Sequence, residues 1–119
     1  MAEVRIGIMG VGVMGSFHFT AVGQLKNCRV TALCDIDPAV LARYRESGVE
    51  LFADSDRLLA SGLVDGVIIA TPHYSHVPIA LAAIKRGIHV LVEKPIAVQK
   101  SDALRLAAAA AAHPELKLS

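Results

Sequence analysis

Three glycines near the amino terminus form the part of this sequence best suited to holding a phosphate group. Gly10, Gly12 and Gly15 follow an apolar run with the spacing G-x-G-x-x-G. The first glycine allows a sharp turn, the second lets a pyrophosphate approach the backbone, and the third lets a helix pack closely on the strand. The helix that begins here would offer free N–H groups to the phosphates. Val13 and Met14, inside the motif, belong to the same candidate site.

An acidic residue follows at the distance that a dinucleotide-binding fingerprint requires. Asp35 lies twenty residues after Gly15, at the end of a second apolar run, where an acid would bind ribose hydroxyls. The next residue is Ile36 rather than the arginine that accommodates a 2′-phosphate, which favours NAD over NADP. The glycines alone could mark an ordinary β–α turn. Strand, glycine turn, helix, strand and acid together indicate dinucleotide binding.

Two further segments carry chemically versatile side chains. Residues 71–76 read Thr-Pro-His-Tyr-Ser-His and follow a fourth apolar run, and Glu93-Lys94-Pro95 follows a fifth. A lysine beside a bound nicotinamide would stabilise negative charge on a hydroxyl that becomes an alkoxide. An isolated lysine is more often a solvated surface charge. A salt bridge between Glu93 and Lys94 is disfavoured, because adjacent side chains on an extended chain point in opposite directions.

The elements that must position these residues alternate along the chain. Apolar runs predict strands at residues 4–9, 30–34, 49–52, 64–70 and 88–92. Helices are expected at 14–26, 38–47, 55–60, 76–86 and 100–113, before a partial sixth strand at 116–119. This alternation predicts an α/β fold of three layers, a Rossmann-type doubly wound parallel sheet with strand order 3-2-1-4-5 and the sixth strand at the edge. Ligands of such sheets bind at the carboxyl ends of the strands, where the order switches direction.

The first helix offers a candidate inner face. Met14, Phe17, Ala21 and Leu25 share one stripe, with Val22 beside them, and this face is expected to pack on the sheet. His18 lies beside this stripe. Packing is the more common role of such a histidine, and contact with a cofactor is the alternative.

Composition excludes several classes of protein. The chain has 119 residues, 54% of them hydrophobic and 19% charged, which predicts one globular domain over residues 1–119. A net charge of +1 without a basic run argues against a nucleic-acid partner. The apolar runs are shorter than the ~18 residues of a membrane span, and no signal peptide is apparent, so a cytoplasmic location is expected. No metal site is expected.

The two cysteines cannot pair with each other. Cys28 and Cys34 are six residues apart. On one extended strand that separation is ~20 Å, whereas a disulfide needs Cα atoms within ~7 Å. Buried, reduced thiols of a cytosolic protein are therefore expected.

The glycine turn, Thr71-Pro72-His73-x-x-His76 and Glu93-Lys94-Pro95 occur here in an order that resembles the glucose–fructose oxidoreductase and inositol dehydrogenase family, often called Gfo/Idh/MocA. The resemblance covers essentially all 119 residues but only the family's amino-terminal domain. It implies that the three glycines cradle the pyrophosphate of NAD and that Asp35 binds the adenosine ribose. It also implies a second domain, absent from this chain, that supplies the sugar pocket and the oligomer interface.

The resemblance also implies roles at the nicotinamide end. Thr71, Pro72 and His76 would border the nicotinamide and its ribose, and Glu93 would contact that ribose. Lys94 would be the catalytic residue that assists proton transfer at the sugar hydroxyl. His73 stands where the family often has asparagine, although an imidazole can also donate a hydrogen bond.

Two functions follow as hypotheses. The first is the NAD-binding domain of an oxidoreductase that acts on a sugar, cyclitol or related polyol, a homo-oligomer whose isolated 119-residue domain is inactive. The alternative is a non-catalytic NAD(H)-binding sensor module. Glu93-Lys94-Pro95 favours the enzyme, because a sensor needs no lysine beside the nicotinamide.

Overall fold

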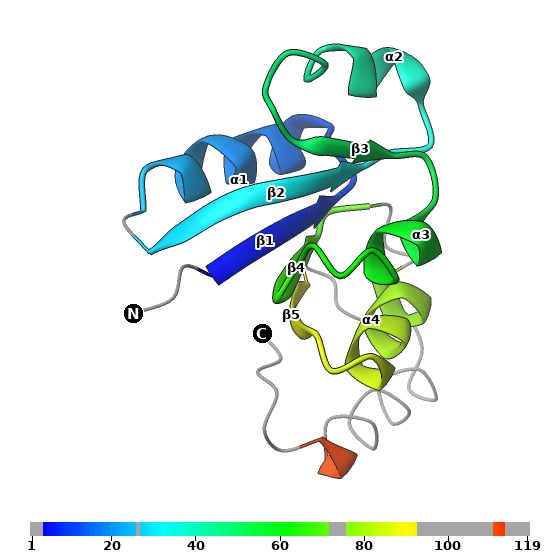
Figure 1. The fold of residues 1–119 in the computed structure, drawn as a ribbon. Helices are drawn as coiled ribbons and strands as arrows, with labels where there is room; N and C mark the ends of the chain where they lie inside the picture. The colour runs from blue at the N-terminus through cyan, green and yellow to red at the C-terminus, as the bar shows by residue number, and fades with distance from the viewer. Residues whose placement is uncertain (1–3, 26, 72–75, 93–110, 114–119) are drawn as a thin grey trace.

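Among the described residues, five parallel strands form a single sheet in the order β3-β2-β1-β4-β5 (Figure 1). The computed structural model describes residues 4–25, 27–71, 76–92 and 111–113. The strands are β1 (Val4–Met9), β2 (Cys28–Cys34), β3 (Glu50–Phe52), β4 (Gly66–Ile69) and β5 (His89–Val92). The predicted α/β fold and strand order are confirmed. The predicted sixth strand, at 116–119, and most of the helix predicted at 100–113 lie outside the described residues.

In the described part of the chain, four helices from α1 to α4 cover the two faces of this sheet (Figure 1). They are α1 (Val13–Gly23), α2 (Pro38–Ala42), α3 (Ser55–Leu59) and α4 (His76–Lys85). The helices α1 and α2 pack on one face, and α3 and α4 on the other. None of the helices in the described part of the chain has the length and apolar character needed to cross a membrane.

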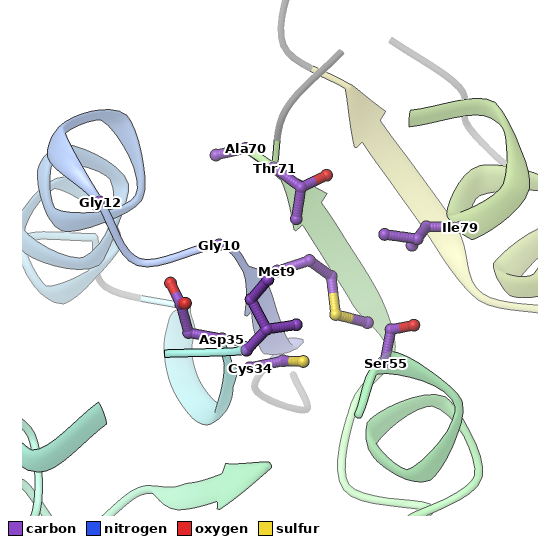
Figure 2. Close-up of a pocket in the computed structure, with 10 residues that line it drawn as sticks. Met9, Gly10, Gly12, Cys34, Asp35, Ser55, Ala70, Thr71 and Ile79 are labelled. Carbon is purple, nitrogen blue, oxygen red and sulfur yellow. The ribbon is translucent and has the colours of Figure 1, made fainter. Parts of the chain in front are cut away.

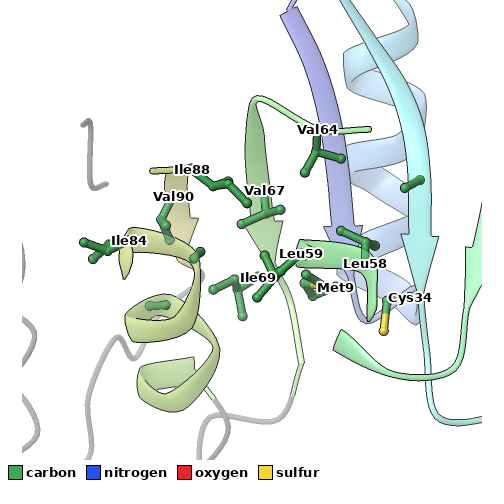
Figure 3. Packing of buried hydrophobic residues seen from close by; sticks show 13 residues of the cluster. Met9, Cys34, Leu58, Leu59, Val64, Val67, Ile69, Ile84, Ile88 and Val90 are labelled. Atoms are coloured by element: carbon green, nitrogen blue, oxygen red, sulfur yellow. The ribbon is translucent and has the colours of Figure 1, made fainter. Parts of the chain in front are cut away.

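The sheet separates two apolar cores, and β1 contributes to both. Ile8 belongs to the core under α1 and α2. Its neighbour Met9 points into the core under α3 and α4 (Figure 3). Successive side chains of a strand alternate between the two faces. All four residues of β4 are buried, as a parallel strand covered on both sides requires. This double cover explains the apolar runs of the sequence.

The inner face of α1 differs from the predicted stripe. Phe17 is 63% exposed and Leu25 is 57% exposed, so their prediction as core residues was wrong. A Cβ on Gly15 would overlap the carbonyl oxygen of Gly10, which shows that Gly15 faces the turn after β1. Val22, seven residues after Gly15 and on the same side of the helix, is buried. Apolar residues occur all round α1, so close packing at Gly15 sets its rotation.

The start of α2 agrees with the sequence prediction, because a capping residue marks it. Asp37 caps α2 by accepting a hydrogen bond from the N–H of Ala39 at 2.9 Å, and Pro38 is the first helical residue, as predicted. The helix ends at Ala42 rather than near residue 47. The segment beyond it continues in tighter turns, in which the Tyr44 N–H donates to the carbonyl three residues back.

The cysteines occupy the two ends of β2. Cys28 begins the strand, two residues before the predicted start, and Cys34 ends it. Both are free thiols; Cys34 is buried as expected, whereas Cys28 is only half-buried at the start of the strand. The prediction that they do not pair with each other is confirmed.

Candidate cofactor-binding site

A cavity of about 450 Å³ lies at the carboxyl ends of the strands (Figure 2). It is located where β1 and β4 lie side by side and the strand order switches direction. Residues from the ends of β1, β2 and β4 and from α3 and α4 line it: Met9, Gly10, Gly12, Cys34, Asp35, Ile36, Ser55, Ala70, Thr71 and Ile79. The predicted site residues Gly10, Gly12, Asp35, Ile36 and Thr71 are therefore brought together in one place.

Backbone hydrogen bonds continue past the strand ends and fix the floor of this cavity. The Gly10 N–H donates to the Cys34 carbonyl at 2.7 Å, which joins the ends of β1 and β2. The Ala70 N–H donates to the Met9 carbonyl at 2.8 Å, which joins the ends of β4 and β1. The loops that carry the site therefore start from fixed points.

Gly10 is required by the backbone itself. Its φ of +87° lies in the region that side chains disfavour. A Cβ at this position would also lie 2.9 Å from the carbonyl carbon of Ala70 and from the nitrogen of Thr71. The glycine thus lets the turn after β1 pass directly against the end of β4.

Gly12 has no such neighbour. No atom of the described residues lies within 4 Å of a Cβ built on it, so the missing side chain leaves open space. Gly12 is the N-cap of α1, and no described side chain caps that helix. The first turn contains no acidic residue. The exposed N–H groups and the positive end of the helix dipole therefore face a space that suits the pyrophosphate of NAD.

Asp35 directs its carboxylate toward the segment from Gly10 to Gly12 (Figure 2). Its Oδ2 accepts a hydrogen bond from the N–H of Val11, and its Oδ1 accepts one from the N–H of Asp37, both at 2.9 Å. A carboxylate has about four acceptor positions, so two remain for the hydroxyls of a ribose.

Cys34 lines the cavity, but it is not a candidate nucleophile. Burial raises the pKa of its thiol to about 12, and the negative charges of Asp35 and Asp54 act in the same direction. The reactive thiolate is therefore scarce at neutral pH.

Other predicted residues are only partly described. Gly15 is buried against the turn and does not line the cavity, in keeping with a packing role. The structure places the backbone of Val13 and Met14 in the first turn of α1 and that of His76 at the start of α4. Four predicted residues lie outside the described residues: Pro72, His73, Glu93 and Lys94.

The cavity lining also includes Ser55 and Ile79, which were not among the predicted site residues. Ser55 follows the carboxyl end of β3, so the rule that collects strand ends at one edge could have placed it there. Ile79 gives no such signal, because its position in a helix predicts only packing. His18 lines a different hollow, together with Leu25 and His89 on the face covered by α1. A cofactor role for His18 is therefore not supported at this cavity.

Residues 4–118 match the model of an oxidoreductase family with an NAD-binding Rossmann fold, the Gfo/Idh/MocA family. The chain belongs to this family. The match confirms the resemblance carried by the sequence motifs and the expected cofactor, NAD. It also favours an oxidoreductase domain over a sensor module.

Individual relatives agree with this assignment. The chain is 37% identical over 109 residues to inositol 2-dehydrogenase 1 of Saccharopolyspora erythraea, which covers 88% of this chain and 32% of the relative. It is similar to the structure of scyllo-inositol dehydrogenase from Lactobacillus casei with bound NAD(H) and scyllo-inositol, with a TM-score of 0.93, 30% identity, and coverage of 98% and 35%. The WlbA dehydrogenase from Bordetella pertussis, solved with NADH and UDP-GlcNAcA, gives a TM-score of 0.90 and 28% identity over 98% of this chain and 36% of that one. The chain spans about a third of the length of these relatives.

Proposed function

We propose that this domain holds NAD(H) for an oxidoreductase that transfers a hydride between the nicotinamide and a carbon of a sugar, cyclitol or related polyol. The observation that carries the proposal is the open space over Gly12, beside the Asp35 carboxylate, at the switch point of the sheet. The pyrophosphate would lie over Gly12 and the start of α1. The adenosine ribose would lie at Asp35.

The charges around the ribose position favour NAD over NADP. A 2′-phosphate would bring a second negative group against the Asp35 carboxylate. Ile36, next in sequence, is 87% exposed and offers no positive charge to such a phosphate. Asp35 therefore selects the cofactor by attraction to hydroxyls and by repulsion of phosphate.

The nicotinamide end is assigned from the family motifs. Bound NAD would supply the hydride acceptor. Thr71 lies in the cavity at the end of β4, and we propose that it borders the nicotinamide together with Pro72 and His76. His73 and Glu93 would contact the nicotinamide ribose. Lys94 would move a proton at the substrate hydroxyl and stabilise the negative charge that develops on its oxygen.

The polyol substrate is supported by the similar proteins. One relative is an inositol 2-dehydrogenase, and one solved structure is a dehydrogenase with scyllo-inositol bound. A ring that carries several hydroxyls is thus the substrate class proposed for the whole protein of which this domain is a part.

Location and assembly complete the proposal. A cytoplasmic location is supported by the two free thiols, Cys28 and Cys34, since such a location keeps thiols reduced. A homo-oligomer is supported by large apolar side chains on the surface, among them Phe17 and Leu25.

Calorimetric titration of NAD and NADP into the 119-residue chain tests the cofactor assignment. NAD should bind more tightly than NADP. Asp35→Ala should weaken NAD binding by about 1–3 kcal/mol, the range for a lost hydrogen bond to a charged group. Asp65→Asn, at the opposite ends of the strands, serves as the control and should leave NAD affinity unchanged. Tighter binding of NADP than of NAD to the unmutated chain would contradict the assignment.

A further inference from the structure

Both oxygens of the Asp35 carboxylate already accept a hydrogen bond from the protein backbone. Oδ2 accepts from the N–H of Val11, inside the glycine turn, at 2.9 Å. Oδ1 accepts from the N–H of Asp37, the cap of α2, at 2.9 Å. The carboxylate therefore joins the end of β2 to two other segments. Contact with a ribose alone would require neither bond.

Val11 is fixed at its side chain and at its N–H. The side chain is 1% exposed and belongs to the core under α1 and α2. Because the residue is buried, an N–H without an acceptor would cost free energy there. Asp35 supplies that acceptor and so holds the turn between Gly10 and Gly12 in place.

Two consecutive N–H groups therefore tie the glycine turn to the end of β2. The Gly10 N–H donates to the Cys34 carbonyl at 2.7 Å, and the Val11 N–H donates to the Asp35 carboxylate at 2.9 Å. Both donors point toward the end of β2. The chain from Gly12 onward is then presented toward the open space, where the phosphates would lie.

We propose that Asp35 is a positioning residue for the glycine turn in addition to its role as a ribose acceptor. This inference rests on the proposed binding of NAD. The carboxylate strengthens binding of the pyrophosphate through Val11, by a route that does not involve the ribose hydroxyls. A small neutral side chain at residue 35 removes the repulsion of a 2′-phosphate but also releases the turn. Such a variant loses NAD affinity without a matching gain for NADP.

The test uses 2′,3′-dideoxy-ADP, which keeps a diphosphate but has neither ribose hydroxyl. Asp35→Ala and Asp35→Asn both remove the charge, and only asparagine keeps an acceptor oxygen for a backbone N–H. The asparagine variant should bind this probe roughly five- to tenfold more tightly than the alanine variant, as expected for one hydrogen bond. Equal affinities, or tighter binding by Asp35→Ala, would overturn the positioning role.

Hydrogen exchange at the amide of Val11 gives a second readout that does not depend on ligand. The amide should exchange slowly in the unmutated chain and in Asp35→Asn, and roughly tenfold or more faster in Asp35→Ala. Fast exchange in the unmutated chain would contradict the inference.

The matched control is Asp37→Ala. This change removes the side-chain cap on the N–H of Ala39 but keeps the backbone N–H that donates to Asp35. It should lower stability while leaving the probe affinity unchanged, and it should speed exchange at Val11 no more than at a core strand amide such as that of Ile8. A change in probe affinity, or a larger effect at Val11 than at Ile8, would show that the effects do not arise from the Asp35 acceptor.

The outcomes separate the two proposals. If the unmutated chain binds neither NAD nor the dideoxy probe, the cofactor assignment fails, and the inference fails with it. If the unmutated chain binds NAD but the two Asp35 variants bind the probe equally, only the positioning role fails.

Discussion

The hydroxyl oxygens of Ser16 and Tyr44 lie 2.7 Å apart, which joins the first turn of α1 to the segment that follows α2. The Tyr44 ring also meets the ring of Phe19 edge to face, with centroids 5.0 Å apart. Edge-to-face pairs of this kind add to the stabilisation that burial provides. The helix whose start forms the proposed phosphate site is therefore held by a polar and an aromatic contact with one tyrosine.

Tyr44→Phe should lower the free energy of unfolding by about 0.5–1.5 kcal/mol, because it removes the hydrogen bond with Ser16 and keeps the ring. Chemical denaturation measures this change. Ser16→Ala and the double variant complete a double-mutant cycle. If the losses in free energy of unfolding caused by the two single changes simply add in the double variant, the two hydroxyls do not stabilise each other.

Gly10→Ala and Gly12→Ala should separate folding from binding. Alanine at residue 10 would adopt an unfavourable φ and press on the backbone of Ala70, so it should destabilise the fold by about 1–3 kcal/mol or more. Alanine at residue 12 meets no atom of the described residues, so stability should change little while NAD affinity falls sharply. Thermal unfolding and calorimetry measure the two effects. Full NAD affinity in Gly12→Ala would place the pyrophosphate elsewhere.

The buried thiol of Cys34 should make stability fall at high pH. Its pKa in the folded protein is raised to about 12, whereas the ordinary value is 9.0. Above pH 9 the unfolded chain therefore binds fewer protons than the folded chain, and stability decreases as pH rises toward 12. Below pH 9 the thiol is protonated in both the folded and the unfolded chain, so it does not make the free energy of unfolding depend on pH. The measurement is the free energy of unfolding at a series of pH values.

Cys34→Ala provides the comparison for this slope. The variant loses the titrating group, so its free energy of unfolding should fall less steeply than that of the unmutated chain above pH 9. Other residues titrate in this range in both proteins and cancel in the difference. Parallel curves for the two proteins would show that the thiol does not carry the effect.

The 119-residue chain should bind NAD without turning over any sugar or inositol at a useful rate. Catalysis requires the substrate carbon within about 3–3.5 Å of the nicotinamide, and lost orientation can cost ~7–11 kcal/mol of barrier lowering. The chain spans about a third of the length of its relatives. Lys94→Ala should leave NAD affinity nearly unchanged. Absorbance of NADH, followed with a panel of polyols, checks this, and steady turnover that disappears in Lys94→Ala would contradict it.

The isolated chain should associate, most simply as a dimer, because apolar side chains such as Phe17 and Leu25 are exposed on and next to α1. Light scattering over a range of concentrations measures the mass. A monomeric mass at every concentration would contradict the prediction.

The sheet could be predicted from the sequence because its signals are local and agree with one another. The apolar run of β4, the cap at Asp37 and the glycine after β1 each specify one feature, and the right-handed crossover then fixes the strand order. The rotation of α1 could not be predicted in this way. It depends on contact between Gly15 and the backbone of Gly10, which lie on different elements.

The part of the candidate site that belongs to the glycine motif could also be predicted, because its signals are local. Gly12 and Asp35 belong to a fingerprint whose spacing appears in the chain itself. Ile79 and Ser55 enter the cavity only because α3 and α4 pack under the same edge of the sheet. The double hydrogen bonding of Asp35 had no signal in the sequence, since its donors are backbone groups that every residue type provides.

Gly10, Asp35 and Ala70 each donate their N–H to a carbonyl oxygen of the neighbouring strand, just beyond the last residue of their own strand. Solvent deuterium should therefore reach the floor of the cavity only when the sheet itself opens, on the slow time scale of global unfolding. The N–H groups in the first turn of α1, which no described side chain caps, should exchange from the native state. The boundary between slow and fast amides then runs between Val11 and the start of α1, and a bound ligand would extend the slow region across it.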